Sequence, residues 1–192
     1  MTAPVAVAER LAEVLPYATT STSYAVTTAD VPRERWVEAV TAARDDEVLD
    51  GTFFDVLLAV DEHPGGFDVV VRLWSVAARH GFHLRTRCPR DDARVPSLTG
   101  VFGGAGWHER EAAEMLGIAF DGHPSLVPLL LPEELAGAHP LRKERVLAAR
   151  QAPWPGAVDP ADKPGRAASR RLQPPGSPPP VPPGDPLPEA GS

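Results

Sequence analysis

Prolines are the feature that most limits what this chain can fold into, because they are distributed unevenly. Of the 23 prolines, 13 fall between Gln151 and Ser192. Proline fixes one backbone angle and has no backbone N–H to donate, so a run this dense can form neither a helix nor a sheet. We therefore expect residues 151–192 to be a disordered tail with polyproline II character.

The first 90 residues have instead the patterns of a folded α+β domain. Apolar residues at helical spacing predict one helix over residues 4–15 and a second that Asp30 caps and that includes Trp36 to Ala43. The strand candidates are Ser21–Thr28, Phe53–Val60, Phe67–Trp74 and Phe82–Cys88. This order predicts a small, mostly antiparallel or mixed sheet with helices packed on one face.

Three of these strands carry more specific patterns. Phe53–Val60 is almost entirely apolar, which predicts burial on both faces of the strand. The turn-forming residues 61–66 separate it from Phe67–Trp74, so we expect these two strands to form a hairpin. Phe82–Cys88 alternates strictly, which predicts a half-buried strand with a basic outer face.

Residues 91–150 differ in character from the core domain predicted over residues 1–90. A glycine-rich loop leads into a predicted helix at Trp107–Leu116, and Gly117 suits the left-handed conformation that ends such a helix. The prolines at positions 124, 128, 132 and 140 then exclude long helices or strands. We expect a helix and a turn, followed by an extended docking arm.

Composition excludes several classes of function. The net charge of −7 belongs to residues 1–150, and an acidic body argues against nucleic-acid binding. No apolar run approaches the roughly 20 residues that span a bilayer, and the N-terminus lacks the pattern of a signal peptide, so we expect a cytoplasmic chain. Cys88 is the only cysteine, and the six histidines lack the spacing of a metal site. The sequence predicts no catalytic, cofactor-binding or metal-binding residue on this chain.

The stretch from Trp107 to Pro124 is the most informative part of the chain. Its carboxylates, Glu109, Glu111 and Glu114, suit either acid–base chemistry or a solvated or partner-facing helix. We favour the second interpretation, because acid–base chemistry needs carboxylates with perturbed pKa values. Such a perturbation requires burial that the sequence does not demonstrate.

Two turns follow this helix. In Gly122-His123-Pro124, glycine permits a positive φ and proline forces His123 to be extended, which predicts a stiff turn that holds the imidazole. Pro140-Leu141-Arg142-Lys143 places two cations after a proline. This second segment is either a basic surface cluster or a charge-matched contact to a partner, and the residues alone leave both interpretations open.

These motifs together resemble the C subunit of NADH-quinone oxidoreductase, the 30-kDa subunit family of respiratory complex I. The resemblance covers about residues 30–145. The strings that carry it are Trp107-x-Glu109-Arg110-Glu111, Gly117-Ile118-x-Phe120-x-Gly122-His123-Pro124 and His139-Pro140-Leu141-Arg142-Lys143. Upstream, Phe54-Asp55-Val56-Leu57, Phe67-Asp68-Val69-Val70 and Val95-Pro96-Ser97-Leu98-Thr99 fit the same family.

The resemblance implies a non-catalytic subunit in the peripheral arm of a proton-translocating enzyme. Such a subunit packs on the large D subunit, which with the B subunit forms the quinone-reducing chamber, and it lies peripherally on the cytoplasmic side of the plasma membrane. NADH, FMN, iron–sulfur clusters and quinone then belong to the assembled complex. The residues expected to be structural or to contact partners are Trp107, Glu109, Arg110, Glu111, Gly122, His123, Pro124, Leu141, Arg142 and Lys143.

One departure from the family pattern follows the first turn. Many members carry Asp-Leu-Arg-Arg there, whereas this chain has Ser125-Leu126-Val127-Pro128. Three other functions are weighed against the complex I subunit. They are the equivalent subunit of a membrane-bound hydrogenase or another complex I-like enzyme, a free-standing enzyme that uses Glu111 or the histidines, and an adaptor that recruits partners through the tail.

Overall fold

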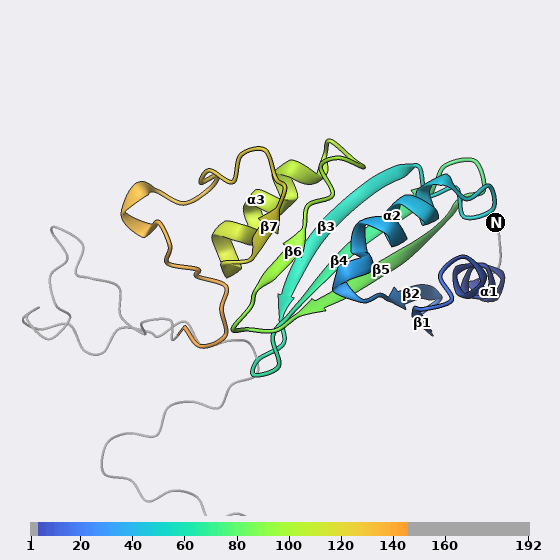
Figure 1. Ribbon diagram of the computed structural model, residues 1–192, viewed down its shortest axis with the longest axis horizontal. Coiled ribbons are helices and arrows are strands. Elements are labelled where there is room, and N and C mark those ends of the chain that lie inside the picture. The colour runs from blue at the N-terminus through green and yellow to red at the C-terminus, as the bar shows by residue number, and fades with distance from the viewer. Residues whose placement is uncertain (1–3, 146–192) are drawn as a thin grey trace, which may run out of the picture. The chain divides into compact units, whose positions relative to one another are not determined.

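A five-stranded mixed sheet is the base of the computed structural model, which describes residues 4–145 (Figure 1). The strands are β1 (Thr19–Ser23), β2 (Val26–Asp30), β3 (Phe53–Asp61), β4 (Phe67–Ser75) and β5 (His80–Cys88). Their order is β1-β2-β5-β4-β3, in which β2 and β5 are parallel and all other neighbours are antiparallel. The predicted α+β class with a mixed sheet is confirmed.

Helices and short strands lie next to this sheet. The helices are α1 (Pro4–Val14), α2 (Trp36–Asp45), α3 (Ala105–Leu116) and the 3-10 helices η1 (Arg33–Arg35) and η2 (Glu133–Leu135). Strands β6 (Arg94–Pro96) and β7 (Ala119–Asp121) form a separate parallel pair. Helix α1 packs against β1 and β2, α2 against β5, and α3 against the edge strand β3.

The hydrophobic core lies on the face of the sheet that the helices cover. Val71 of β4 lies opposite Leu84 of β5, and both are fully buried. Leu11 of α1 and Trp36 of α2 are fully buried in the same cluster. The alternation predicted for β5 is confirmed, because Leu84 and its alternate neighbours face the core while the basic residues between them face outward.

Two expectations for the first 45 residues were wrong. The single strand expected at Ser21–Thr28 is a hairpin, which turns at Tyr24 and Ala25 with φ angles of 49° and 61°. Two-residue hairpin turns with positive φ usually contain glycine or asparagine, and this one has neither. Asp30 does not cap a helix but ends β2, where it accepts hydrogen bonds from the guanidinium of Arg85 at 2.5 and 2.9 Å.

The apolar sequence of strand β3 predicted burial on both faces, and this prediction was wrong. The strand lies at the edge of the sheet, and the side chains of Phe53, Leu58 and Val60 are 51, 43 and 38% exposed. Side chains alternate between the two faces of a strand, so Leu58 and Val60 point away from the core that Leu57 faces. The hairpin between β3 and β4 is confirmed.

Residues beyond position 90 share the core of the first 90. Val95, Leu98 and Leu116 belong to the same hydrophobic cluster as the sheet, and residues 4–145 lie within one compact unit. The predicted division at residue 90 therefore separates two parts that have a common core. The predicted tail, residues 151–192, lies outside the described residues.

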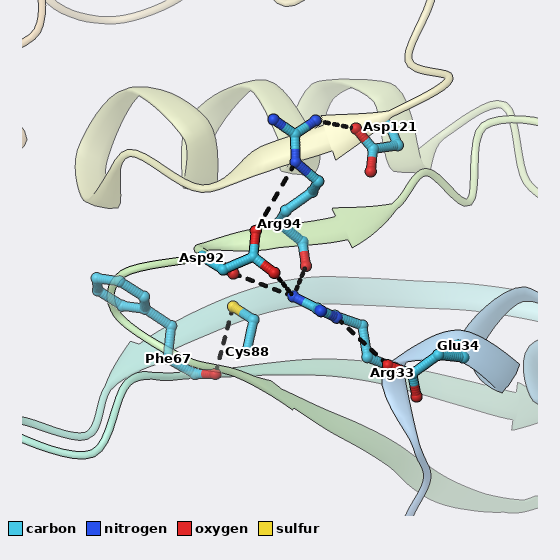
Figure 2. Close-up of polar contacts among 7 residues, drawn as sticks. All are labelled: Arg33, Glu34, Phe67, Cys88, Asp92, Arg94 and Asp121. Carbon is cyan, nitrogen blue, oxygen red and sulfur yellow. Dashed lines mark hydrogen bonds and ion pairs between the residues drawn. The ribbon is translucent and has the colours of Figure 1, made fainter.

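A polar network joins the two parts near β6 (Figure 2). The guanidinium of Arg33 donates to Asp92 Oδ2 at 2.7 Å and to the carbonyl oxygen of Arg94 at 3.3 Å, and Arg94 in turn pairs with Asp121. Cys88 lies beside this network, and its thiol donates to the carbonyl oxygen of Phe67 at 3.7 Å. Burial raises the pKa of the Cys88 thiol, so this side chain packs as a neutral group.

Within residues 4–145, no helix has both the length and the apolar character needed to cross a bilayer.

Candidate docking site on helix α3 and its arm

Helix α3 ends at Gly117, where the extended chain crosses back over the helix terminus. Gly117 has a φ of 74°, and its N–H donates to the carbonyl oxygen of Ala113 at 2.8 Å. A Cβ at this position would lie 2.5 Å from Nη2 of Arg142 and 2.7 Å from Nε2 of His139. Glycine is therefore required both by the backbone angle and by the close approach of the returning chain.

Glu109 is a buried structural carboxylate. Its side chain is fully inaccessible, and it accepts hydrogen bonds from Ser97 Oγ and from the N–H of Leu98, each at 2.6 Å. Burial raises the pKa of Glu109, although Ser97, Leu98 and the nearby His123 oppose this shift. Because both oxygens are occupied by internal donors, Glu109 fixes the loop before α3 and cannot reach a substrate.

His123 closes the turn after β7 against the first residues of α3. Its side chain is 3% exposed, and its Nε2 lies 3.1 Å from the carbonyl oxygen of Gly106. Its Nδ1 accepts the N–H of Ser125 at 2.9 Å, and these two partners assign the proton to Nε2. Gly122, with a φ of 83°, permits this turn, so the stiff turn expected around His123 is present.

The chain that follows this turn, residues 124–145, is called the arm below. Glu114 holds its middle, because the carboxylate accepts the N–H groups of Leu129, Leu130 and Leu131 at 3.1, 2.7 and 2.9 Å. One helical turn earlier, Arg110 donates to the carbonyl oxygens of Val127 and Pro128 at 2.9 and 2.7 Å. Two side chains of α3 thus satisfy backbone groups of residues 127–131, which belong to no helix or strand.

The end of the arm is held at the C-terminus of α3. Arg142 Nε donates to the carbonyl oxygen of Leu116 at 2.7 Å, and the N–H of Leu141 donates to that of Met115 at 3.2 Å. His139 Nδ1 lies 3.0 Å from the carbonyl oxygen of Glu114. These contacts satisfy carbonyl groups that a helix end leaves without intrahelical donors.

Asp61, at the end of β3, holds the last described residues of the arm. Its carboxylate is 2% exposed, accepts the N–H of Lys143 at 2.8 Å and pairs with Arg90. The ring of Phe67 lies 4.8 Å from the guanidinium carbon of Arg90 and 5.5 Å from that of Arg142. The carboxylate of Asp61 and the cation–π contact between Arg142 and Phe67 therefore join the arm to the sheet, and Arg90, from the loop after β5, contacts both Asp61 and Phe67.

The arm and α3 leave a set of large apolar side chains exposed, which we call the apolar surface. Its members are Trp107, Leu126, Val127, Leu130, Leu135 and Leu141, which are between 40 and 64% exposed. The guanidinium carbon of Arg110 lies 5.2 Å from the Trp107 ring and orients it. Five of these six side chains belong to the arm, and several exposed large apolar side chains on one ordered segment are characteristic of a protein contact.

The ten residues expected from the sequence thus divide by environment. Glu109, Arg110, His123 and Arg142 direct their polar groups into the chain itself. Trp107, Glu111 and Leu141 are exposed, and Gly122, Pro124 and Lys143 shape or follow the turns. The sequence-based set missed Glu114, Asp61, Arg90 and His139, which hold the arm. The i, i+4 spacing of Arg110 and Glu114 was visible, but the backbone groups that they bind became apparent only in the folded chain.

The anchoring by Glu114 predicts a pH dependence. Burial alone would raise the pKa of Glu114, but the N–H groups of Leu130, Leu131 and Leu129 lower it below its usual range. A carboxyl whose folded pKa is lowered contributes stability above its unfolded pKa of about 4.3, and the contribution is lost as the pH falls through the folded value.

We therefore expect the amide NMR signals of residues 129–131 to titrate together, with a midpoint below about 4.3. The Glu114→Gln variant should show no such titration. A midpoint at or above the ordinary glutamate value in the unaltered chain would contradict the anchoring role.

Within the described part of the chain, no group of three or more His, Cys, Asp or Glu side chains is placed to hold a metal ion.

Comparison with known proteins agrees with the motifs. Residues 29–151, more than half of the chain, match the family model for the respiratory-chain NADH dehydrogenase 30 Kd subunit. The chain is 42% identical over 120 residues to the C subunit of NADH-quinone oxidoreductase from Roseiflexus castenholzii, covering 62% of this chain and 68% of that protein. It is 37% identical over 122 residues to NADH-quinone oxidoreductase subunit 5 of Thermus thermophilus, covering 59% of this chain and 58% of that protein.

Two solved structures share the fold. A trypsin-resistant fragment of Nqo5 (residues 1–134) is 26% identical, with a TM-score of 0.55, covering 62% of this chain and 98% of the fragment. A chain of the membrane-bound sulfane sulfur reductase, an archaeal respiratory membrane complex, has a TM-score of 0.64 at 24% identity. The second alignment covers 76% of this chain and 86% of that one, and it shows the fold alone.

Proposed function

The chain belongs to the 30-kDa subunit family of respiratory-chain NADH dehydrogenase, and from this premise we propose that it is a non-catalytic peripheral-arm subunit of a proton-translocating NADH-quinone oxidoreductase. In this proposal the arm docks on the large D subunit, which with the B subunit forms the quinone-reducing module. The chain lies peripherally on the cytoplasmic side of the membrane. NADH, FMN, iron–sulfur clusters and quinone are bound by other subunits.

One observation carries this proposal: α3 holds an irregular arm so that its apolar side chains face outward. Glu114 and Arg110 fix the backbone of residues 127–131, while the side chain of Leu130 remains 60% exposed. When an extended segment is already ordered before it binds a partner, less conformational entropy is lost on association, and the cost of binding is lower. The arm is therefore suited to bind a protein surface without first folding on it.

The carboxylates of α3 argue against a free-standing enzyme. Glu109 is enclosed by Ser97 and Leu98, and Glu114 is occupied by the arm. Two of the three carboxylates that the sequence connects with acid–base chemistry are thus used to hold the chain together, and the third, Glu111, is exposed on the surface of α3. The role of Glu109 and Glu114 in this proposal is to position the apolar surface against the D subunit.

Replacing Leu130 with aspartate should separate docking from folding. Leu130→Asp places a charge on the apolar surface, so recovery of the D subunit with a tagged chain should fall by about tenfold or more. Val76→Asp is the matched control, because Val76 is 65% exposed and lies between β4 and β5, away from the arm. Unchanged recovery with Leu130→Asp, or an equal loss with both variants, would count against docking through the arm.

The second candidate is the equivalent subunit of another complex I-like enzyme, because the same fold occurs in the sulfane sulfur reductase chain. The proteins that co-purify with the tagged chain decide between the two candidates. NADH-binding subunits would support the first. A partner with nickel-ligating cysteine pairs, recovered without NADH-binding subunits, would instead identify a hydrogenase-type complex.

A further inference from the structure

The hairpin of β1 and β2 carries a fully exposed aromatic side chain at its tip. Tyr24 is 100% exposed, and the other residues between positions 21 and 25 are exposed as well. Within residues 4–145 the Tyr24 side chain makes no hydrogen bond or ring contact, so it does not stabilise the fold. Tyrosine is one of the residue types that supply most of the binding energy of protein contacts.

The turn holds Tyr24 in an unfavourable backbone conformation. Tyr24 and Ala25 have φ angles of 49° and 61°, in the left-handed region that residues with a Cβ seldom adopt. Asparagine followed by glycine would form the same two-residue turn with less strain. A strained backbone and an exposed aromatic side chain thus coincide where neither helps the chain to fold. Such a combination indicates a role in binding.

The hairpin holds the Tyr24 ring in place before any partner is bound. All of β1 pairs with β2, up to Ser23 opposite Val26 at the turn. Across the pair, Oγ1 of Thr22 lies 3.2 Å from Oγ1 of Thr27. A side chain that is presented on a paired hairpin loses less entropy on binding than one on an unstructured loop.

The segment around Tyr24 is free of charge. No charged side chain and no histidine occurs between Glu13 and Asp30, although charged residues make up 23% of the chain. Protein interfaces are depleted of charged residues at their centre, and antibody binding surfaces combine tyrosine with serine. The absence of cations argues against a nucleic acid, and one aromatic ring among hydroxyl groups is not the apolar face that binds a lipid surface. The hairpin therefore fits an uncharged surface of a protein.

The hairpin is separate from the arm. In the sheet, β1 lies at one edge, and β3, whose last residue Asp61 holds the arm, lies at the opposite edge. A contact made by Tyr24 is therefore a second contact, in addition to docking through the arm.

We propose that the hairpin of β1 and β2 inserts Tyr24 into a pocket on a neighbouring subunit of the assembled enzyme. The pocket has apolar walls that enclose the ring, an uncharged rim, and a polar group at its end that forms a hydrogen bond with the phenol hydroxyl. This contact holds the chain in the assembly at a second point. The proposal rests on the proposed function, because the neighbouring subunit belongs to the same assembly.

Nitration of the two tyrosines of the chain, Tyr17 and Tyr24, tests the contact directly. The isolated chain and the assembly, purified through a tagged D subunit, are treated with tetranitromethane, and nitration at each site is measured by mass spectrometry. Tyr24 should react at least about tenfold more slowly in the assembly, because an enclosed ring is inaccessible to the reagent. Equal nitration of Tyr24 in the two samples would overturn the proposal.

Tyr17 is the internal reference for this measurement. Its hydroxyl is buried, and burial raises the pKa of Tyr17, so less of the reactive phenolate is present. Tyr17 should therefore react slowly in both samples.

Tyr24→Asn tests the contact without disturbing the turn. Asparagine adopts a positive φ readily, so the melting temperature of the variant should equal or exceed that of the unaltered chain. When both are co-expressed in equal amounts, the variant should be about tenfold less abundant than the unaltered chain in the purified assembly. Equal abundance of the two would count against the proposal.

Leu58→Asn is the matched control for this competition. Leu58 is 43% exposed on β3, at the opposite edge of the sheet, and its replacement should leave incorporation into the assembly unchanged. An equal loss with Leu58→Asn and Tyr24→Asn would show that the hairpin has no specific role.

The outcomes distinguish this inference from the proposed function. Absence of the unaltered chain from the assembly purified through the D subunit would refute the proposed function. A chain that is present in that assembly, with Tyr24 as reactive as in the isolated chain, would refute only the contact through the hairpin. Protection of Tyr24 in the isolated chain at high concentration would assign the hairpin to a second copy and would also overturn the proposal.

Discussion

Glu114→Ala should release the arm from α3 while the sheet stays folded. The variant removes the acceptor of three backbone N–H groups, those of Leu129, Leu130 and Leu131, in a segment that has few other contacts. Local opening then exposes the arm to proteases without global unfolding. We expect cleavage between Leu129 and Leu131 by thermolysin, which cuts before large apolar residues, to accelerate by about tenfold or more, with little change in the melting temperature.

Glu111→Ala is the matched control for this experiment. Glu111 lies on the same helix as Glu114 but makes no polar contact within residues 4–145, so its loss should leave cleavage of the arm unchanged. Recovery of the D subunit should fall with Glu114→Ala, because a released arm has to be ordered again on binding. Cleavage at the unaltered rate in Glu114→Ala would show that the arm is held by other groups.

Glu109→Ala should have the largest effect on the stability of the fold. The change leaves the N–H of Leu98 without an acceptor, removes one of the partners of the Ser97 hydroxyl, which keeps Thr99 Oγ1 at 2.7 Å, and opens a cavity under α3. The loss of stability should be about 2–4 kcal/mol, which urea denaturation would measure. The melting temperature should fall by about 10 °C.

Glu109→Gln separates the shape of the side chain from its charge. The amide keeps the volume of the carboxylate and one acceptor for the N–H of Leu98, so this variant should lose less stability than Glu109→Ala. Assembly should decline in both variants only as far as the chain unfolds. An unchanged melting temperature in Glu109→Ala would be the contrary result, and it would return Glu109 to the candidates for acid–base chemistry.

Much of the fold follows from local patterns in the sequence. The helices α1 and α3, the β3–β4 hairpin and the alternation of β5 were predicted because periodicity and turn residues act over a few positions. The hairpin at Tyr24 and Ala25 was missed because its turn lacks the residues that usually adopt positive φ. The exposure of Phe53 was missed because an apolar run does not show that one face of its strand points away from the core.

The candidate site likewise has features that could be predicted from the sequence and features that could not. Its residue string was recognisable in the sequence, and so were the stiff turn at His123 and the glycine that ends α3. Which carboxylate is buried, which binds the arm and which remains exposed could not be predicted, since Glu109, Glu111 and Glu114 lie on one short helix with similar neighbours. Their environments depend on loops and an arm that are distant in the sequence.

The family, the α+β class and the positions of most helices and strands could be predicted from the residues alone, because these depend on motif strings and short-range periodicity. The folded chain was needed to show that β3 is an edge strand, that Glu114 and Asp61 hold the arm and that Glu111 is left without an internal partner among residues 4–145. Burial and hydrogen-bond partners are set by the order of strands in the sheet and by contacts between distant segments, which no local pattern contains.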